Sequence, residues 1–434
     1  MDKMADVLGR AGAWCGQNKY LSAIKNAFQN FMPLTIAGAI GVLWCNVLVN
    51  DQTGLGLFFK PIMALDFLNP AFQAVNFCTI SCITVGITLG IAQEIGVWNM
   101  GAERAGYIPG LVGLAAWLSV TNTSHMVDGA KEAFTGIAGN ELGATGLFTG
   151  MIIGVLSVEL FCFFEKQDAL KIKMPEQVPP GVARAFEVLV PATITLIITA
   201  CIGSACYNLT GLYLNDVIKN GVQGPLGAVG ATVPGVMIIY LVIMLFWLVG
   251  IHGNNMLSAV KEALFTPLAL ENVEAFNKGE TPKNIINMYF LQMCGEFGGL
   301  GVTIGLVIAI MIFGKREDNK AIATLSLVPG LFNINETVTF GIPMVLNPIL
   351  GIPFVVAPLV TIIIGYVLTV IGFCPVACLT VPWTCPPIVF GFLACGANVM
   401  GAVTQAILIV VSTVIYVPFL ISYEKYQNKQ AAEA

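Results

Sequence analysis

The most restrictive feature of this chain is a stretch of 103 residues, from Ala321 to Tyr423, that carries a single charged side chain, Glu336. A helix needs only about 20 consecutive apolar residues to cross roughly 30 Å of hydrocarbon. Further runs with little or no charge lie earlier, at about 30–50, 67–93, 105–122, 142–164, 188–214 and 228–251. These runs predict an all-α polytopic membrane protein, because helices satisfy their own backbone polar groups in lipid.

The composition of the 434 residues supports this fold class. Hydrophobic residues make up 56% and charged residues 10%, with a mean hydropathy of +0.82. Soluble globular chains carry about 25% charge, so an ordinary soluble enzyme is excluded. The basic residues form no large patch, which excludes nucleic-acid binding. His125 and His252 are too far apart in the sequence for zinc-site spacing, so we expect neither a metal nor a cofactor.

The basic residues alternate between strongly and weakly basic connections. Four precede the first apolar run, and Lys166, Lys171, Lys173 and Arg184 cluster between the fourth and fifth. The positive-inside rule then places both termini in the cytoplasm. This pattern predicts four parts: a cytoplasmic amphipathic segment, an amino-terminal membrane half, a carboxy-terminal membrane half and a cytoplasmic tail, at residues 1–29, 30–187, 188–423 and 424–434.

Simple alternation fails in the middle of the chain. The basic loops at 261–283 and 315–320 both favour the cytoplasm, although one apolar run, 284–314, lies between them. That run is interrupted by glycines around Glu296, and the uncharged run 220–260 is longer than one helix needs. Either run could contain a re-entrant segment, which membranes tolerate where it lines a protein cavity.

Glu336 is the first candidate functional residue. A carboxylate at membrane depth costs about 2.5–3.5 kcal/mol unless it faces water or a partner. It is therefore interpreted as part of a substrate or proton site, with a structural cap of a broken helix as the alternative. Prolines and glycines around it predict short helices and broken hairpins, the form in which transporters present polar groups to a substrate. The neighbouring side chains of Asn333, Asn335 and Thr337 could bind sugar hydroxyl groups.

His252 is the second candidate, with a hydrogen-bonded structural histidine as the alternative interpretation. It lies between Gly250 and Gly253, which would open the helix, and it is preceded by Trp247 and followed by Asn254. A desolvated carboxylate has a raised pKa, so Glu336 and His252 could together bind and deprotonate a hydroxyl group. Their proximity in space does not follow from the sequence.

Trp383 lies in a proline-rich turn that ends at Pro386 and Pro387, which exclude a helix there. The indole could anchor the chain at the membrane interface or stack on a sugar face. Composition does not decide between these two roles.

At Asn333–Glu336 and the following Phe340–Pro348, the sequence resembles the membrane (IIC) subunits of the bacterial phosphotransferase system, in the lactose, cellobiose and diacetylchitobiose family. The resemblance extends to Tyr20–Ile24 with Met32–Ile36, Val178–Val182, Gly250–Gly253 and Val381–Pro387. It implies about ten transmembrane helices with re-entrant hairpins and amphipathic interfacial helices in the bacterial cell membrane. It also implies a homodimer formed mainly through the amino-terminal half and a sugar chamber in the carboxy-terminal half.

The resemblance further implies roles for the candidate residues. Glu336 would bond the 6-hydroxyl of a disaccharide such as cellobiose, lactose or diacetylchitobiose, with His252 beside it and Trp383 near the sugar. Enzyme I, HPr and IIA would pass a phosphoryl group to a IIB protein, and the phosphorylated IIB protein would deliver it to the sugar. We expect IIB to be a separate protein, because the sequence given ends at Ala434 without such a domain.

Two departures from the family pattern leave the sugar preference open. Thr337 stands where many relatives have proline, and Cys385 stands where threonine is commoner. Two other functions also remain open at this point: an ion-coupled secondary transporter that uses Glu336 as its proton site, and a non-transporting membrane sensor. The chain is thus expected to be a transporter subunit of a phosphotransferase complex or one of these alternatives.

Overall fold

The computed structural model describes residues 10, 14, 17–51, 55–125, 134–175, 177–342 and 344–433. Most of the predicted amphipathic segment before residue 17 lies outside these ranges, and from Lys19 the chain is helical. Apart from a short antiparallel pair, β1 (Ser124–His125) with β2 (Phe134–Thr135), the elements among the described residues are helices. The α-helices of the first half are α2 (Lys19–Leu43), α3 (Asn69–Cys78), α4 (Ile83–Met100), α5 (Ala102–Ala105), α6 (Ile108–Val120), α7 (Gly139–Leu142), α8 (Ala144–Glu165) and α9 (Pro180–Thr210). Those of the second half are α10 (Leu214–Ile218), α11 (Gly224–Gly230), α12 (Val233–Leu248), α13 (Gly253–Asn277), α14 (Met288–Gly295), α15 (Ile304–Phe313), α16 (Glu317–Leu331), α17 (Glu336–Gly341), α18 (Gly351–Val370), α19 (Val389–Ala394) and α20 (Val399–Glu433).

Six helical stretches of the described chain are long and apolar enough to cross a membrane. They are Lys19–Leu48, Lys60–Met100, Ala144–Glu165, Pro180–Thr210, Gly351–Val370 and Val399–Glu433. Shorter apolar helices occupy Ile108–Val120, Val233–Leu248 and Ile304–Phe313. The prediction of an all-α polytopic membrane protein is confirmed. The expected number of ten spans stays a prediction.

The chain forms two compact units. Unit 1 comprises residues 1–16, 39–73 and 228–434, and unit 2 comprises residues 17–38 and 74–227. This grouping follows packing alone. The predicted division into a dimerising half and a sugar-binding half stays a prediction.

Unit 2 is built from helices that pack through small residues. A Cβ atom added at Gly113 in α6 would lie 2.3 Å from the Cβ atom of Ala92 in α4, and one added at Gly150 in α8 would lie 2.2 Å from the hydroxyl of Thr88. These glycines let the three helices approach closely, as small residues do between membrane helices. Trp117 is 1% exposed and fills the core between them.

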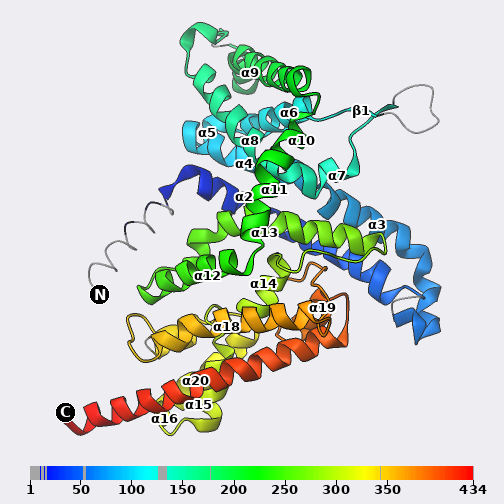
Figure 1. Ribbon diagram of the computed structural model, residues 1–434. Coiled ribbons are helices and arrows are strands. Elements are labelled where there is room, and N and C mark those ends of the chain that lie inside the picture. The colour runs from blue at the N-terminus through cyan, green and yellow to red at the C-terminus, as the bar shows by residue number, and fades with distance from the viewer. Residues whose placement is uncertain are drawn as a thin grey trace. The chain divides into compact units, whose positions relative to one another are not determined.

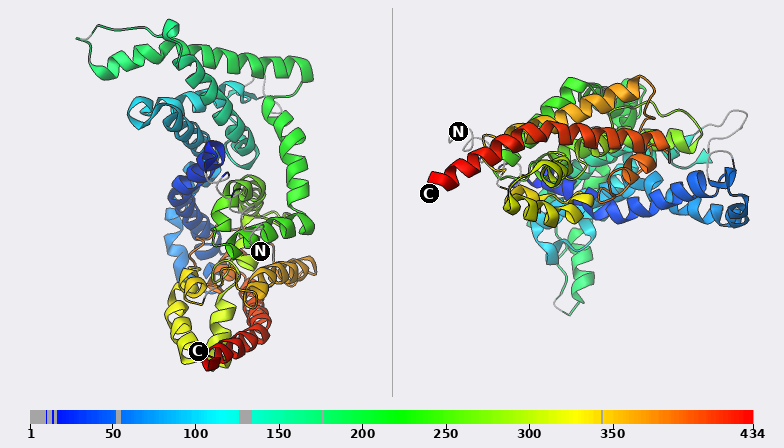
Figure 2. Two further views of the ribbon diagram at one scale, coloured as in Figure 1. Left: turned by 90° about the vertical axis from the view of Figure 1, so that its left-hand side faces the viewer. Right: turned by 90° about the horizontal axis from the view of Figure 1, so that it is seen from below.

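Unit 1 contains shorter, interrupted helices. The long α20 packs against α15, α18 and α19, and Figures 1 and 2 show it, in red, beside the yellow segment that holds α15 and α16. At about 1.5 Å per residue, the eight residues of α14 and the ten of α15 are each too short to cross the hydrocarbon alone. The predicted short helices around Glu336 are present in part, as α16 and α17, whereas α18 has 20 residues and is long enough to cross a membrane.

Both runs that could have held a re-entrant segment are interrupted. The run 220–260 is divided among α11, α12 and the start of α13, and the run 284–314 is divided between α14 and α15. The interpretation of 261–283 as a basic loop is wrong for its first part, because residues 261–277 continue α13. Lys261 is 3% exposed there. The sequence pattern predicts a solvent-exposed Lys261, because the partner that accompanies its burial, Glu296, lies 35 residues further along the chain.

Candidate functional site

A glycine-rich turn between α14 and α15 forms the base of the candidate site. Gly298, Gly299 and Gly301 have φ angles of +68°, +88° and +84°, a region that L-residues with a side chain rarely occupy. A Cβ atom added at Gly299 would lie 2.5 Å from the side chain of Asn335, and one at Gly301 would lie 2.4 Å from the ring of Phe354. The turn therefore requires glycine both for its backbone angles and for the close approach of its neighbours.

Asn333 connects this turn to the proline-rich turn that carries Trp383. Its φ of +62° is in the left-handed region, which asparagine tolerates better than most residues. Its Oδ1 accepts a hydrogen bond from the Gly298 amide at 2.6 Å, and its Nδ2 donates to the backbone oxygens of Trp383 and, at 3.1 Å, Cys385. One side chain thus holds three segments of unit 1 together.

Asn335 ties the start of α17 to the same glycine-rich turn. Its side chain is buried and donates from Nδ2 to the Leu300 oxygen at 2.6 Å. The next residue, Glu336, begins α17 and is exposed, as is Thr337. The Glu336 carboxylate makes no hydrogen bond or ion pair to the part of the chain that the structure describes. The amides on its amino-terminal side therefore orient the turn, while the Glu336 side chain is exposed.

His252 forms the amino-terminal cap of α13. Its Nδ1 accepts a hydrogen bond from the Asn255 amide at 3.3 Å. In the neutral ring this assigns the proton to Nε2. The preceding Gly250 has a φ of +81°, and a Cβ atom at Gly253 would lie 2.0 Å from the Ile243 oxygen, so the predicted opening of the helix by these glycines is present.

Trp247 joins the His252 turn to α17. Its ring lies 4.7 Å from the ring of His252 and 6.4 Å from the ring of Phe340, measured between centroids. Phe340 is four residues after Glu336 in α17, so the two project from the same side of that helix. The structure thus brings His252 and the helix of Glu336 against one indole, which the sequence did not reveal. Trp247 is 3% exposed, and its indole N–H has no acceptor among the described residues.

A cluster of charged and polar side chains contacts the beginning of α13, next to His252. Lys261 donates from Nζ to the Asn254 Oδ1 at 2.8 Å and forms an ion pair with Glu296, the first residue of the glycine-rich turn. The Glu296 Oε1 also accepts a hydrogen bond at 2.7 Å from the hydroxyl of Tyr240 in α12, a residue that is fully buried. Sequence reasoning found Glu296 and Asn254 but missed Lys261 and Tyr240.

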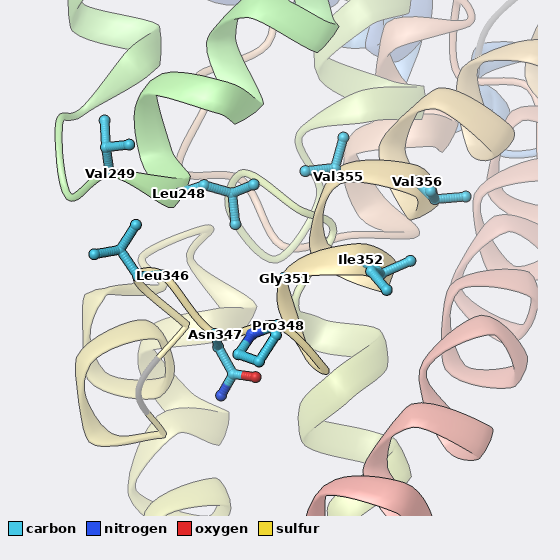
Figure 3. A pocket seen from close by; sticks show the side chains of 9 residues that line it. All are labelled: Leu248, Val249, Leu346, Asn347, Pro348, Gly351, Ile352, Val355 and Val356. Atoms are coloured by element: carbon cyan, nitrogen blue, oxygen red, sulfur yellow. The ribbon is translucent and has the colours of Figure 1, made fainter. Parts of the chain in front are cut away.

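A cavity of about 350 Å³ lies near the end of α12, and its lining differs from the predicted sugar-binding residues. Figure 3 shows that its lining comes from the end of α12, the loop at 346–348 and the first turns of α18. Asn347 contributes the polar side chain of this lining, and the other side chains are aliphatic. A disaccharide needs many hydrogen-bonding groups, and none of the eight predicted site residues lines this cavity.

The predicted residues therefore differ in their surroundings. Glu336, Thr337 and Trp383 have exposed side chains, whereas the amides of Asn333, Asn335 and Asn254 are engaged with other protein groups. Direct contact of any of them with a sugar stays a prediction.

Comparison with known proteins identifies the family. Residues 25–358 match the family model described as "Phosphotransferase system, EIIC". The chain is 32% identical over 429 residues to the oligo-beta-mannoside-specific EIIC component of the phosphotransferase system of Bacillus subtilis (strain 168), which covers 98% of this chain and 94% of the relative. It is 29% identical to the cellobiose-specific EIIC component of Lactococcus lactis subsp. lactis (strain IL1403), over 98% of each chain.

A solved structure agrees with these relatives. The crystal structure of the transporter ChbC, the IIC component from the N,N'-diacetylchitobiose-specific phosphotransferase system, superimposes with a TM-score of 0.88 and 29% identity, over 97% of each chain. The resemblance inferred from the motifs is thus confirmed, and the ion-coupled alternative is not supported. This chain belongs to the EIIC family of the phosphotransferase system and is a multi-pass membrane protein.

Proposed function

We propose that this chain binds a disaccharide of the cellobiose, lactose or diacetylchitobiose type, carries it across the membrane and presents its 6-hydroxyl group to a separate phosphorylated IIB protein. One observation carries the proposal: His252 and the helix of Glu336 pack on the same indole, Trp247. Asn333 holds the turn of Trp383 beside the start of that helix. A carboxylate and an imidazole can accept a hydrogen bond from a sugar hydroxyl, and an aromatic ring can stack on the face of a sugar ring.

The proposed chemistry divides between the two proteins. The 6-hydroxyl oxygen attacks the phosphorus of a phosphocysteine on IIB, an oxygen–phosphorus bond forms, and the sulfur–phosphorus bond breaks to release the thiolate. The hydroxyl proton passes to Glu336 or His252, which act on the acceptor as general bases. Catalysis by this chain is then mainly the positioning of the hydroxyl group in line with the donor. The buried indole N–H of Trp247 supplies a further donor for a sugar oxygen.

The proposal includes how the protein is assembled and oriented. Both termini lie in the cytoplasm, the homodimer forms mainly through the amino-terminal half, and IIA, HPr and enzyme I supply the phosphoryl group. The clustered basic side chains at 166–184 support a cytoplasmic location for that connection. Labelling of single cysteines introduced at 171 and 430 in sealed cells with an impermeant reagent tests the orientation. Labelling from outside would contradict it.

Reconstituted vesicles test the function directly. The purified chain is placed in vesicles with the complete phosphoryl relay and offered cellobiose, lactose, diacetylchitobiose and simple glucosides. We expect sugar phosphate to accumulate for one class of disaccharide. Accumulation of free sugar instead would favour the ion-coupled transporter, and binding without any flux would favour a sensor.

Glu336→Gln is the critical variant. The amide keeps the size of the side chain but loses the charge, so we expect sugar binding or phosphorylation to fall at least about 100-fold, as for a group that contacts the reacting hydroxyl. Glu103→Gln, an exposed carboxylate in α5, is the matched control and should behave as the wild type. Unchanged uptake and phosphorylation in Glu336→Gln would exclude the proposed role.

A further inference from the structure

The buried ion pair of Lys261 and Glu296 connects the two halves of the candidate site. Lys261 Nζ binds the side chain of Asn254, two residues after His252, and its other bond goes to Glu296. Both charged side chains are largely removed from solvent, with 4% and 14% of the Lys261 and Glu296 side chains exposed. The ion pair therefore fixes the beginning of α13 against the start of the glycine-rich turn.

The same glycine-rich turn holds the segment of Glu336. The Gly298 amide donates to Asn333, and the Leu300 oxygen accepts from Asn335, so the turn is hydrogen-bonded on both sides of its tip to the residues that precede Glu336. A continuous series of contacts thus runs from His252, through the ion pair and the turn, to Glu336.

Stability alone does not account for a buried ion pair here. Removing two charges from water is expensive, and replacing a buried pair with apolar residues of similar volume is often neutral or stabilising. The ion pair instead provides directional contacts. Lys261 bridges two oxygen acceptors, and Glu296 receives both the ammonium group and the hydroxyl of Tyr240. Such contacts restrict the positions of the attached segments more than apolar packing does.

We propose that Lys261 and Glu296 are positioning residues that fix the position of His252 relative to Glu336 for transfer of the phosphoryl group to the sugar. They do so through Asn254 on one side and the glycine-rich turn on the other, without contacting the sugar. The inference rests on the proposed function and adds two residues to it.

The double variant Lys261→Met with Glu296→Gln separates positioning from stability. Each single variant leaves a buried charge without its partner and is expected to lower folded yield. The double variant removes both charges of the pair, so its thermal unfolding midpoint in detergent should return to near that of the wild type. Its turnover in sugar phosphorylation should stay at least about 10-fold lower, with the dissociation constant of the sugar changed less than about 3-fold, because misplacement of reacting groups mainly affects the chemical step.

The control is the exposed pair Glu274 and Lys278 on the same helix, whose side-chain atoms lie 2.6 Å apart. The double variant Glu274→Gln with Lys278→Met removes a similar pair and should leave turnover unchanged. Wild-type turnover in the Lys261 and Glu296 double variant would overturn the inference. Absence of sugar phosphorylation by the wild-type chain would instead overturn the proposed function.

A second pair of variants covers the case in which the double variant does not fold. Asn254→Ser keeps an uncharged oxygen that can accept from Lys261, whereas Asn254→Leu removes it. Positioning predicts that Asn254→Leu loses at least about 10-fold in turnover and that Asn254→Ser loses less, since only Asn254→Leu removes the acceptor for Lys261. Equal loss in both would mean that the Asn254 NH₂ group acts on the sugar itself and would overturn the inference.

Discussion

The two units differ in which residue types adopt a positive φ angle. In unit 2, the described residues with a left-handed backbone are glycines, Gly101, Gly106 and Gly211. In unit 1, five residues with side chains also adopt a positive φ, namely Val302, Asn333, Leu346, Ile388 and Ala397. Such conformations cost about 1–3 kcal/mol each and persist only where the surroundings determine them. Unit 1 therefore maintains strained backbone where unit 2 maintains regular helices.

Among the described residues, side-chain amides that bond to the backbone of distant segments are more frequent in unit 1, whereas intrahelical hydroxyl bonds occur in both units. In unit 2, hydroxyl groups such as those of Thr121 and Ser157 bond to carbonyls of their own helices. In unit 1, amides such as those of Asn333 and Asn335 bond to the backbone of distant segments. Interrupted helices leave backbone groups without partners, and within a membrane protein other side chains must satisfy them. The comparison predicts that amide and glycine substitutions are most damaging in unit 1.

The largest effect is expected for Asn333→Leu. It removes the bonds to Gly298, Trp383 and Cys385 and leaves their backbone groups unsatisfied, at about 1–3 kcal/mol each. We expect the free energy of unfolding to fall by about 3–5 kcal/mol and sugar affinity to be lost. Denaturation in detergent with a parallel binding measurement tests this. Asn208→Ala, at an exposed position in unit 2, is the control. A small loss of unfolding free energy, equal in both variants, would contradict the proposed difference between the units.

Gly299→Ala should have the next largest effect. Alanine at a φ of +88° is strained, and its Cβ atom would lie 2.5 Å from the Asn335 side chain. Left-handed strain of about 1–2 kcal/mol and crowding of about 1–3 kcal/mol add to a destabilisation of about 2–5 kcal/mol. Thermal unfolding measures it. At Gly181, where an added Cβ atom meets nothing within 4 Å, the same substitution should change stability little. A tolerated Gly299→Ala would argue that the turn is not rigid.

In unit 2 the corresponding substitution is Gly113→Ala. The backbone is helical there, so only the 2.3 Å approach to Ala92 opposes the new methyl group. Overpacking predicts a loss of about 1–3 kcal/mol in the free energy of unfolding. The folded fraction should bind sugar with unchanged affinity, as titration calorimetry can show. A selective loss of sugar affinity would mean that the packing of unit 2 also shapes the site.

The smallest effect is expected at the charged edge of unit 2. Arg104 and Arg184 both bind Glu165 and Glu187, at 2.8–2.9 Å. The hydrogen bond that Arg104 donates to Glu165 raises the pKa of its guanidinium group, so it stays charged at any relevant pH. Glu187→Gln leaves the Glu165 bonds in place and should cost less than about 1 kcal/mol, because the carboxylate is partly exposed. The difference from the wild type should disappear in 1 M salt, which screens exposed charges. A difference that persists there would indicate that Glu187 acts through more than a charge–charge interaction.

Much of this fold could be predicted because charge is so scarce in the chain. The uncharged runs predicted the long helices, and the prolines and glycines around Glu336 predicted the short ones, since both signals are local. The glycines beside His252 likewise predicted the opening of the helix that places it at the start of α13.

The site could be predicted only in part, because its connections are not local. Nothing adjacent to Lys261 distinguishes it from a solvent-facing lysine, and its ion pair with Glu296 becomes visible only when α13 and the glycine-rich turn are folded together. Asn333 and Asn335 are polar residues in an apolar segment, and their predicted contact with a sugar stays a prediction. The pattern could not show that their amides are engaged with backbone groups 35 or more residues away.

The pairing of Lys261 with Glu296 also sets the electric field that an incoming phosphoryl group would meet. The pair has no net formal charge, so Glu296 contributes little repulsion, and Glu336 is the one carboxylate between residues 321 and 423. If a doubly charged phosphoryl group came within about 10 Å of an uncompensated carboxylate, at an effective dielectric constant of about 20, the two would repel each other by about 3 kcal/mol. That corresponds to roughly a 100-fold slower transfer. A single buried lysine therefore lets the protein keep Glu296 in the glycine-rich turn without adding a net charge there.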